Sequence, residues 1–77
     1  MEALLEFLAR SLVDEPEAVS VEGFDEDDDT IVLELSVAEG DAGQVIGRGG
    51  RTASALRTVM RAVASRDGDR VIVDVVD

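Results

Sequence analysis

The sequence predicts one small α+β domain, in which helices cover one face of a three-stranded mixed sheet in the order α-β-β-α-α-β. The 77-residue chain is about the size of one small domain. Apolar residues recur at helical spacing in two segments, 1–14 and 51–65. They alternate with polar residues in two others, 18–24 and 30–38, and a third apolar segment, 71–76, predicts the closing strand.

The first predicted helix is amphipathic. Its apolar residues fall within about one third of the helical wheel: Met1, Leu4, Leu5, Leu8 and Leu12. Charged residues lie opposite them: Glu2, Glu6 and Arg10. Because Pro16 disfavours helical geometry in the residue before it, we expect this helix to end near Asp14.

The next two segments predict a β-hairpin. Val19 and Val21 alternate with polar residues in 18–24, and apolar residues share one face of 30–38. Five consecutive acids, residues 25–29, separate the two strands. They lack the central glycine and terminal glutamate of a calcium-binding EF-hand loop, so we interpret them as a solvated turn and expect no metal site.

Two helices and a strand are predicted after the hairpin. Asp41 and Gln44 have capping-box spacing, which predicts a short helix over 42–46. A longer helix is expected over 51–65, with a buried stripe of Ala53, Leu56, Val59, Met60, Val63 and Ala64. The segment 71–76 is apolar on both faces apart from Asp74, which predicts a central strand.

The composition excludes many kinds of chemistry. The chain has no His, Cys, Lys, Tyr or Trp, so it lacks thiolate and imidazole metal ligands and most nucleophiles and general bases. We therefore predict no enzymatic activity, no catalytic residue, no metal and no cofactor. Since neither a signal peptide nor a membrane-spanning run is recognisable, we expect a cytoplasmic protein with no membrane insertion.

The net charge of −11 is unevenly distributed. Residues 1–40 hold 13 acids and one base, a net charge of −12, whereas residues 41–77 hold five acids and six arginines, a net charge of +1. The stretch 43–65 contains four arginines and no acid. A polyanion is therefore expected to approach this stretch while the rest of the surface repels it. A solvated helix face that happens to carry arginine explains the same pattern.

Three glycines in four residues, Gly47-Arg48-Gly49-Gly50, lie between the two later helices. Such a loop indicates unusual backbone geometry or close approach to another backbone. Amides at the start of the following helix favour an anion, and Arg48 and Arg51 add charged hydrogen-bond donors. A helix–turn–helix corner that needs glycine only for its bend remains the alternative. Walker and dinucleotide-binding loops do not fit, because the chain has no lysine and position 52 is threonine.

With a hairpin before it and a strand after it, this loop resembles the GxxG loop of the KH RNA-binding domain, which clamps about four backbone nucleotides. The order α-β-β-α-α-β resembles the type II KH arrangement. The likeness covers residues 1–77 as a single KH domain, and the sequence is similar to the small stand-alone bacterial KhpA family. The resemblance implies that the chain binds single-stranded RNA.

The resemblance also implies which residues contact RNA. In KH domains the loop holds the sugar-phosphate chain, and the adjacent helices and the middle strand hold the bases. We expect the loop residues to contact the backbone: Gly47, Arg48, Gly49 and Gly50. Ile46 is expected to line the base side, Arg51 the rim of the groove, and Ser54 the groove by its spacing.

Partners and a cellular role are implied by the same resemblance. KhpA-like proteins associate with themselves as dimers and with a larger KH protein, KhpB, also called EloR or Jag. They are described as RNA chaperones in post-transcriptional regulation, cell elongation and shape, and envelope homeostasis. The strong acidity motivates one alternative, a protein-interaction (dimerisation) subunit whose own KH groove is idle.

Overall fold

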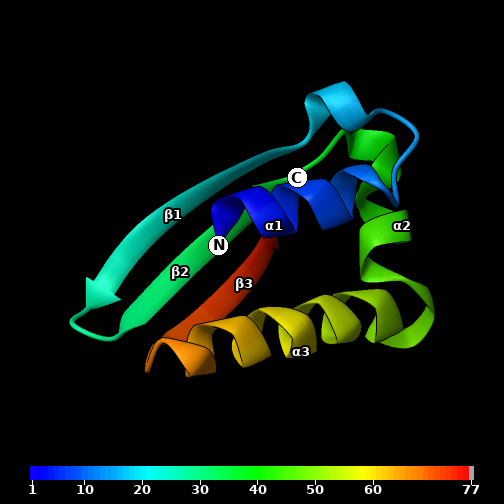
Figure 1. The fold of residues 1–77 in the computed structure, drawn as a ribbon. Helices are drawn as coiled ribbons and strands as arrows, with labels where there is room; N and C mark the ends of the chain where they lie inside the picture. The colour runs from blue at the N-terminus through cyan, green and yellow to red at the C-terminus, as the bar shows by residue number, and fades with distance from the viewer. Residues whose placement is uncertain (77) are drawn as a thin grey trace.

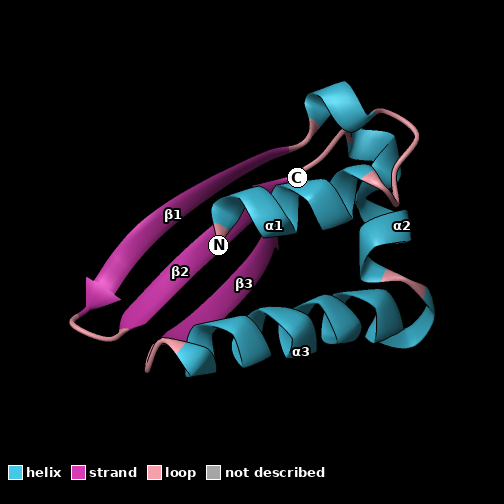
Figure 2. Ribbon diagram, viewed as in Figure 1, coloured by secondary structure: helices cyan, strands magenta, loops and turns pink. Residues whose placement is uncertain are grey.

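Three helices and three strands follow one another in the predicted order in the computed structural model, which describes residues 1–76 (Figures 1 and 2). The helices are α1 (Glu2–Arg10), α2 (Ala42–Ile46) and α3 (Arg51–Arg66), and the strands are β1 (Ser20–Asp27), β2 (Thr30–Ser36) and β3 (Arg70–Val76). Short 3₁₀ turns occupy Pro16–Ala18, Glu39–Asp41 and Arg48–Gly50. The predicted α+β, KH-like class is confirmed.

The three strands form one mixed sheet in the order β1-β2-β3. β1 and β2 pair antiparallel as a hairpin, and β3 pairs parallel to β2. A parallel pair needs a crossover connection, which α2 and α3 provide. The prediction that the last strand is central is wrong, because β3 is an edge strand and β2 is the middle one. The apolar run of 71–76 suggested a strand buried on both faces, but Ile72 on the face away from the helices is 43% exposed.

The core lies between the sheet and the helices, which cover one face (Figure 2). Five large side chains in it are fully buried, and they come from both helical and strand segments: Leu5, Leu33, Leu35, Val45 and Met60. Burying one such side chain contributes about 1.5–3 kcal/mol. The alternation read in 30–38 is confirmed, because Leu33, Leu35 and Val37 are all buried on the helix-covered face.

Two predicted helical features are wrong in detail. α1 ends at Arg10 rather than near Asp14, and the Ser11 hydroxyl donates a hydrogen bond of 2.9 Å to the Phe7 carbonyl oxygen. In α3, Val59 is 44% exposed instead of buried. Helical spacing places Val59 at the border of the buried stripe, where it lines an open groove between α1 and α3.

The predicted capping box is also wrong. Neither the Asp41 side chain nor any other caps α2. Instead, Asp41 is only 3% exposed and its Oδ2 accepts a hydrogen bond of 3.0 Å from the Glu15 amide. Gln44 Nε2 donates to Asp14 Oδ2 at 3.3 Å. Both side chains therefore fasten α2 to the segment that follows α1, a long-range use that local spacing does not reveal.

The acidic segment 25–29 is partly strand rather than wholly turn. β1 continues to Asp27, with a bulge between Asp25 and Asp27, and only residues 28 and 29 form the turn. Pairing with β2 overrides the low strand propensity of the acids. Among residues 1–76, no group of three acids has a geometry that would hold a metal ion. Within the same residues, no helix has the length and hydropathy to cross a membrane.

Candidate nucleic-acid interface

The glycine loop forms the corner between α2 and α3. Gly47 ends α2, where its amide donates to the Gly43 carbonyl oxygen at 2.8 Å. One 3₁₀ turn, Arg48–Gly50, then leads into α3, and the Gly50 amide donates to the Gly47 carbonyl oxygen at 3.0 Å. The chain thus turns a corner from α2 into α3 within four residues (Figure 1).

Gly47 is required by its backbone conformation and by its surroundings. Its φ of 77° and ψ of 169° lie in a region that is essentially limited to glycine. A Cβ at this position would also lie 2.8 Å from the backbone nitrogen of Thr52. Gly47 therefore has a structural role, in that it lets the first turn of α3 pack against the end of α2.

Gly49 and Gly50 differ from Gly47. Both have left-handed backbones, with φ of 65° and 78°. A Cβ at either position would meet no atom within 4 Å. The backbone of these two residues is therefore open to an approaching ligand, and the corner is not filled by neighbouring atoms.

The start of α3 offers positive potential beside this open backbone. Gly50 is the N-cap residue, and no side chain caps the helix end. The dipole of a 16-residue helix favours an anion there. Arg48 and Arg51 are exposed, and within residues 1–76 the ion pair that forms joins Arg10 to Glu6 instead. Both guanidinium groups are therefore available to phosphate oxygens.

The remaining predicted site residues flank the corner. Ile46, the last residue of α2, is 43% exposed although it is a large apolar side chain. Ser54 is exposed in the first turn of α3. All seven predicted residues lie between positions 46 and 54, on the end of α2, the loop and the first turn of α3.

The strand beside the two helices is β3, at the sheet edge, rather than the middle strand β2 that the resemblance implied. Arg57 joins α3 to this edge: its Nε donates to the Val73 carbonyl oxygen at 3.2 Å. Helical spacing places Arg57 outside the predicted buried stripe of 51–65, yet its side chain is half-buried. Only the position of β3 could have revealed this contact.

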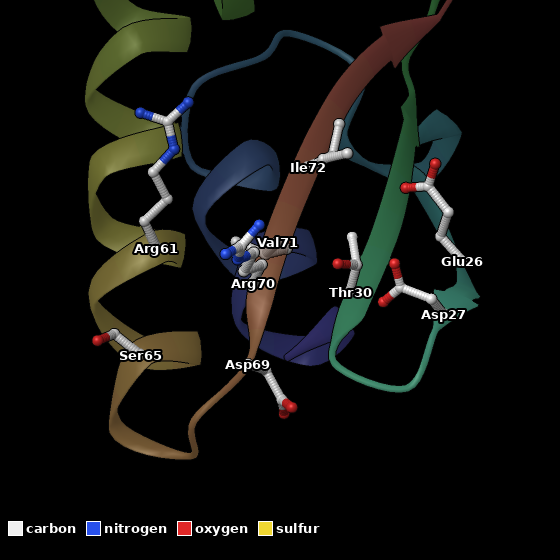
Figure 3. Close-up of a pocket in the computed structure, with 9 residues that line it drawn as sticks. All are labelled: Glu26, Asp27, Thr30, Arg61, Ser65, Asp69, Arg70, Val71 and Ile72. Carbon is white, nitrogen blue, oxygen red and sulfur yellow. The ribbon is translucent and has the colours of Figure 1, made fainter.

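A hollow of about 620 Å³ lies at the far end of α3, where α3 turns into β3 (Figure 3). Arg61, Ser65 and Arg70 line it from α3 and β3, and three carboxylates also line it: Glu26, Asp27 and Asp69. Since the acids outnumber the arginines, this hollow is less suited to a polyanion than the glycine loop, which lies in the acid-free stretch 43–65.

Comparison with known proteins agrees with this geometry. A family model described as KhpA/KhpB, KH domain matches residues 2–75. The chain is 46% identical to the RNA-binding protein KhpA of Clostridium acetobutylicum, over 99% of this chain and 100% of the relative. It is also 46% identical to the KhpA of Halalkalibacterium halodurans, over 100% of each. This chain belongs to the KhpA/KhpB family of KH domains. More distant members of that family include the KhpA of Chlamydia trachomatis, at 40% identity over 100% of this chain and 97% of the relative.

The family match includes every element that builds the corner. Residues 2–75 contain α2, the glycine loop, α3 and the edge strand β3 apart from its last residue. The KH resemblance stated from the sequence is thereby confirmed. No solved structure matches the chain significantly.

Proposed function

We propose that this protein binds the sugar-phosphate backbone of single-stranded RNA through its GxxG loop, residues 47–50, without catalysing a reaction. Membership in the KhpA/KhpB family supports RNA binding, since the curated relatives are named RNA-binding protein KhpA. In this proposal it acts in the cytoplasm as an RNA chaperone with a KhpB-type partner. Its role is in post-transcriptional regulation, cell elongation and envelope homeostasis.

The observation that carries the proposal is the open, left-handed backbone of Gly49 and Gly50 at the uncapped start of α3. Without β-carbons, these residues let a phosphodiester approach the amides of the helix end. Arg48 and Arg51 add charge-assisted hydrogen bonds to phosphate oxygens. Ile46 supplies an apolar contact for a base, and Ser54 a hydroxyl for a base edge or sugar.

Binding by this site is expected to be weak and tolerant of sequence. Only two arginines flank the loop, so few phosphates are neutralised and affinity falls with salt. Both aromatic residues, Phe7 in α1 and Phe24 in β1, lie on other elements. Stacking, which elsewhere contributes about 1–3 kcal/mol per base, is therefore missing at the loop.

Gly49 and Gly50 provide a direct test that spares the fold. We would compare a double variant, Gly49→Asp with Gly50→Asp, with the matched control Gly49→Asn with Gly50→Asn. Asp and Asn both tolerate left-handed backbone and have nearly the same shape, and both positions have free space. The aspartates should weaken binding of an eight-nucleotide oligouridylate about tenfold or more, because they repel phosphate. The asparagines should weaken it much less.

Fluorescence anisotropy at low salt measures both affinities, and circular dichroism confirms that both variants fold. Equal affinity for the aspartate and asparagine variants would contradict a phosphate contact at this loop. Gly47 is left unchanged, because a Cβ there would lie 2.8 Å from the Thr52 nitrogen and disturb the fold itself.

A second candidate function, a dimerisation subunit with an idle KH groove, is favoured by a separate surface. An almost wholly apolar groove of about 260 Å³ runs between α1 and α3. Its apolar lining consists of Leu8, Leu12, Ala55, Leu56 and Val59. Such a groove suits association with a second KH chain, either another copy or a KhpB-type partner.

The variant Val59→Glu tests whether the groove between α1 and α3 joins two copies. Thr58→Glu is the control, since it adds an equal charge on the exposed side of α3. If the groove joins two copies, only Val59→Glu should shift the sedimentation coefficient to that of a monomer. If the KH groove beside the glycine loop is idle, the wild-type protein should not bind oligouridylate at low salt, where electrostatic attraction is least screened. A clear titration there would exclude this second function.

A further inference from the structure

The face of the sheet opposite the helices carries two ordered rows of side chains. The strand register aligns Phe24 with Val32 and Val32 with Ile72, which forms an apolar row across all three strands. Two residues along each strand, Glu22 pairs with Glu34 and Glu34 with Asp74, which forms a row of carboxylates. Alternation along a strand puts both rows on the same face, and their neighbours Leu33 and Val73 are buried on the other.

The apolar row is exposed to solvent on a sheet that has helices on its other face only. Phe24 is 47% exposed and Ile72 43% exposed, while Val32 between them is half-buried. Figure 3 views this face, with α1 behind the strands, and shows Ile72 next to the hollow described above. Since strands lie about 4.8 Å apart, the row is about 10 Å wide. Because the three side chains are contiguous rather than scattered singly, the row is a candidate interaction surface.

The carboxylate row determines the charge of what binds there. Like charges directly opposite one another destabilise a sheet, and Glu22, Glu34 and Asp74 are held in this arrangement. Within residues 1–76 none of the three forms an ion pair, because the ion pair found joins Arg10 to Glu6. Arg70 lies beyond the apolar row, near Asp27 and on the other side of Ile72 from Asp74. A cationic occupant would relieve the repulsion within the row.

Charge complementarity excludes the other plausible occupants. A second copy of this chain would bring its own carboxylate row against the first, and each copy carries a net charge of −11. RNA phosphates and anionic lipids would be repelled by the same row. A basic protein segment that also carries apolar side chains is complementary to both rows. A helix with an apolar stripe is one of the layers that bury the open face of a sheet.

We propose that the open face of the sheet is a docking site for a basic amphipathic helix of a partner protein. Its apolar side chains lie over Phe24, Val32 and Ile72, and its lysines or arginines lie over Glu34 and the two acids beside it. This surface is distinct from the glycine loop and from the groove between α1 and α3. It allows the protein to bind a protein partner and RNA at the same time.

The test uses the full chain and a synthetic 15-residue helical peptide with a leucine stripe and flanking lysines. The matched control is a peptide of the same composition in scrambled order, which keeps the charge but loses the stripe. In nitrogen–proton correlation spectra at physiological salt, the helical peptide should shift the amide signals of Phe24, Val32 and Ile72. It should bind about tenfold more tightly than the scrambled peptide, as expected for burying roughly 60 Å² more apolar surface.

Variants assign the contribution of each row. Phe24→Ser and, separately, Ile72→Ser should each weaken binding about tenfold, and Glu34→Gln should weaken it about threefold, as for an exposed ion pair. The control Asp28→Asn removes an equal charge in the hairpin turn and should leave affinity unchanged. Urea denaturation of each variant shows that it remains folded.

Several results would overturn the proposal. Equal affinity for the two peptides, or shifts confined to residues 25–29, would show general attraction to an acidic protein. Shifts confined to the α1–α3 groove would place the peptide elsewhere. If the wild-type protein forms dimers and Phe24→Ser does not, a second copy covers this face. If oligouridylate shifts the amide signals of Phe24, Val32 and Ile72, RNA covers it.

Discussion

Replacing Gly47 by alanine should destabilise the fold by about 4 kcal/mol. Its φ of 77° and ψ of 169° fall in the glycine-only region, where another residue costs about 1–3 kcal/mol. The new Cβ would also lie 2.8 Å from the Thr52 backbone nitrogen, and relieving such a contact costs a further ~1–3 kcal/mol. A chain of 77 residues has a total stability of about 4–12 kcal/mol, so the loss is a large fraction of it.

Urea denaturation followed by circular dichroism measures this loss, with Gly49→Ala as the matched control. Gly49 also has positive φ, 65°, but a Cβ there meets no atom within 4 Å. Only the left-handed backbone is then penalised, by about 1–2 kcal/mol. The two substitutions are chemically identical and lie two residues apart. Their difference therefore reports the contact with Thr52 together with the higher backbone cost of the glycine-only region at Gly47. Equal free energies of unfolding for the two variants would refute the structural role assigned to Gly47.

Three other predictions concern the core and the acidic segments. Leu33→Ala, in the middle strand where Leu33 is fully buried, should lower the free energy of unfolding by about 3 kcal/mol in urea denaturation. Asp41→Ala removes the acceptor of the Glu15 amide and should cost about 1–3 kcal/mol, whereas a loss below that range would mean that water replaces the carboxylate. The Asp29 amide lowers the pKa of the Asp27 carboxyl, so a carboxyl NMR titration should find that pKa below its ordinary value. The resulting stability is present above the unfolded-state pKa and is lost as pH falls through the folded-state pKa, a pH dependence that Asp27→Asn should remove.

Local pattern was sufficient to predict most of the fold. The alternation in 30–38 and the helical spacing in 51–65 gave the correct element types, because one face of each segment is buried in a single core. The errors arose where a long-range contact competes with local spacing. Asp41 has the position of a capping residue, yet the Glu15 amide, 26 residues away, takes its carboxylate. No window of sequence contains both partners.

In the candidate site, too, local sequence predicts some features, and others depend on long-range contacts. The glycines and arginines of 47–51 could be selected as candidates from sequence, because phosphate-binding loops depend on residue type and spacing. The different structural roles of the three glycines could not be predicted from sequence. Gly47 is fixed by its proximity to Thr52, whereas Gly49 and Gly50 face open space. Sequence alone also could not show that β3 forms the sheet edge, and this placement exposes Ile72 and pairs it with Val32.

The distribution of acids along the fold reconciles a net charge of −11 with the anion binding proposed for the glycine loop. The Arg70 amide donates to the Asp29 carbonyl oxygen at 2.7 Å, so the acidic hairpin turn lies near the C-terminal end of α3. The glycine loop lies at the other end of this 16-residue helix, about 24 Å away at 1.5 Å per residue. At physiological ionic strength the Debye length is about 8 Å, so the hairpin acids are largely screened at the loop. The acids of the hairpin therefore add little to the potential that a phosphate meets at the loop, where the two arginines and the start of α3 lie.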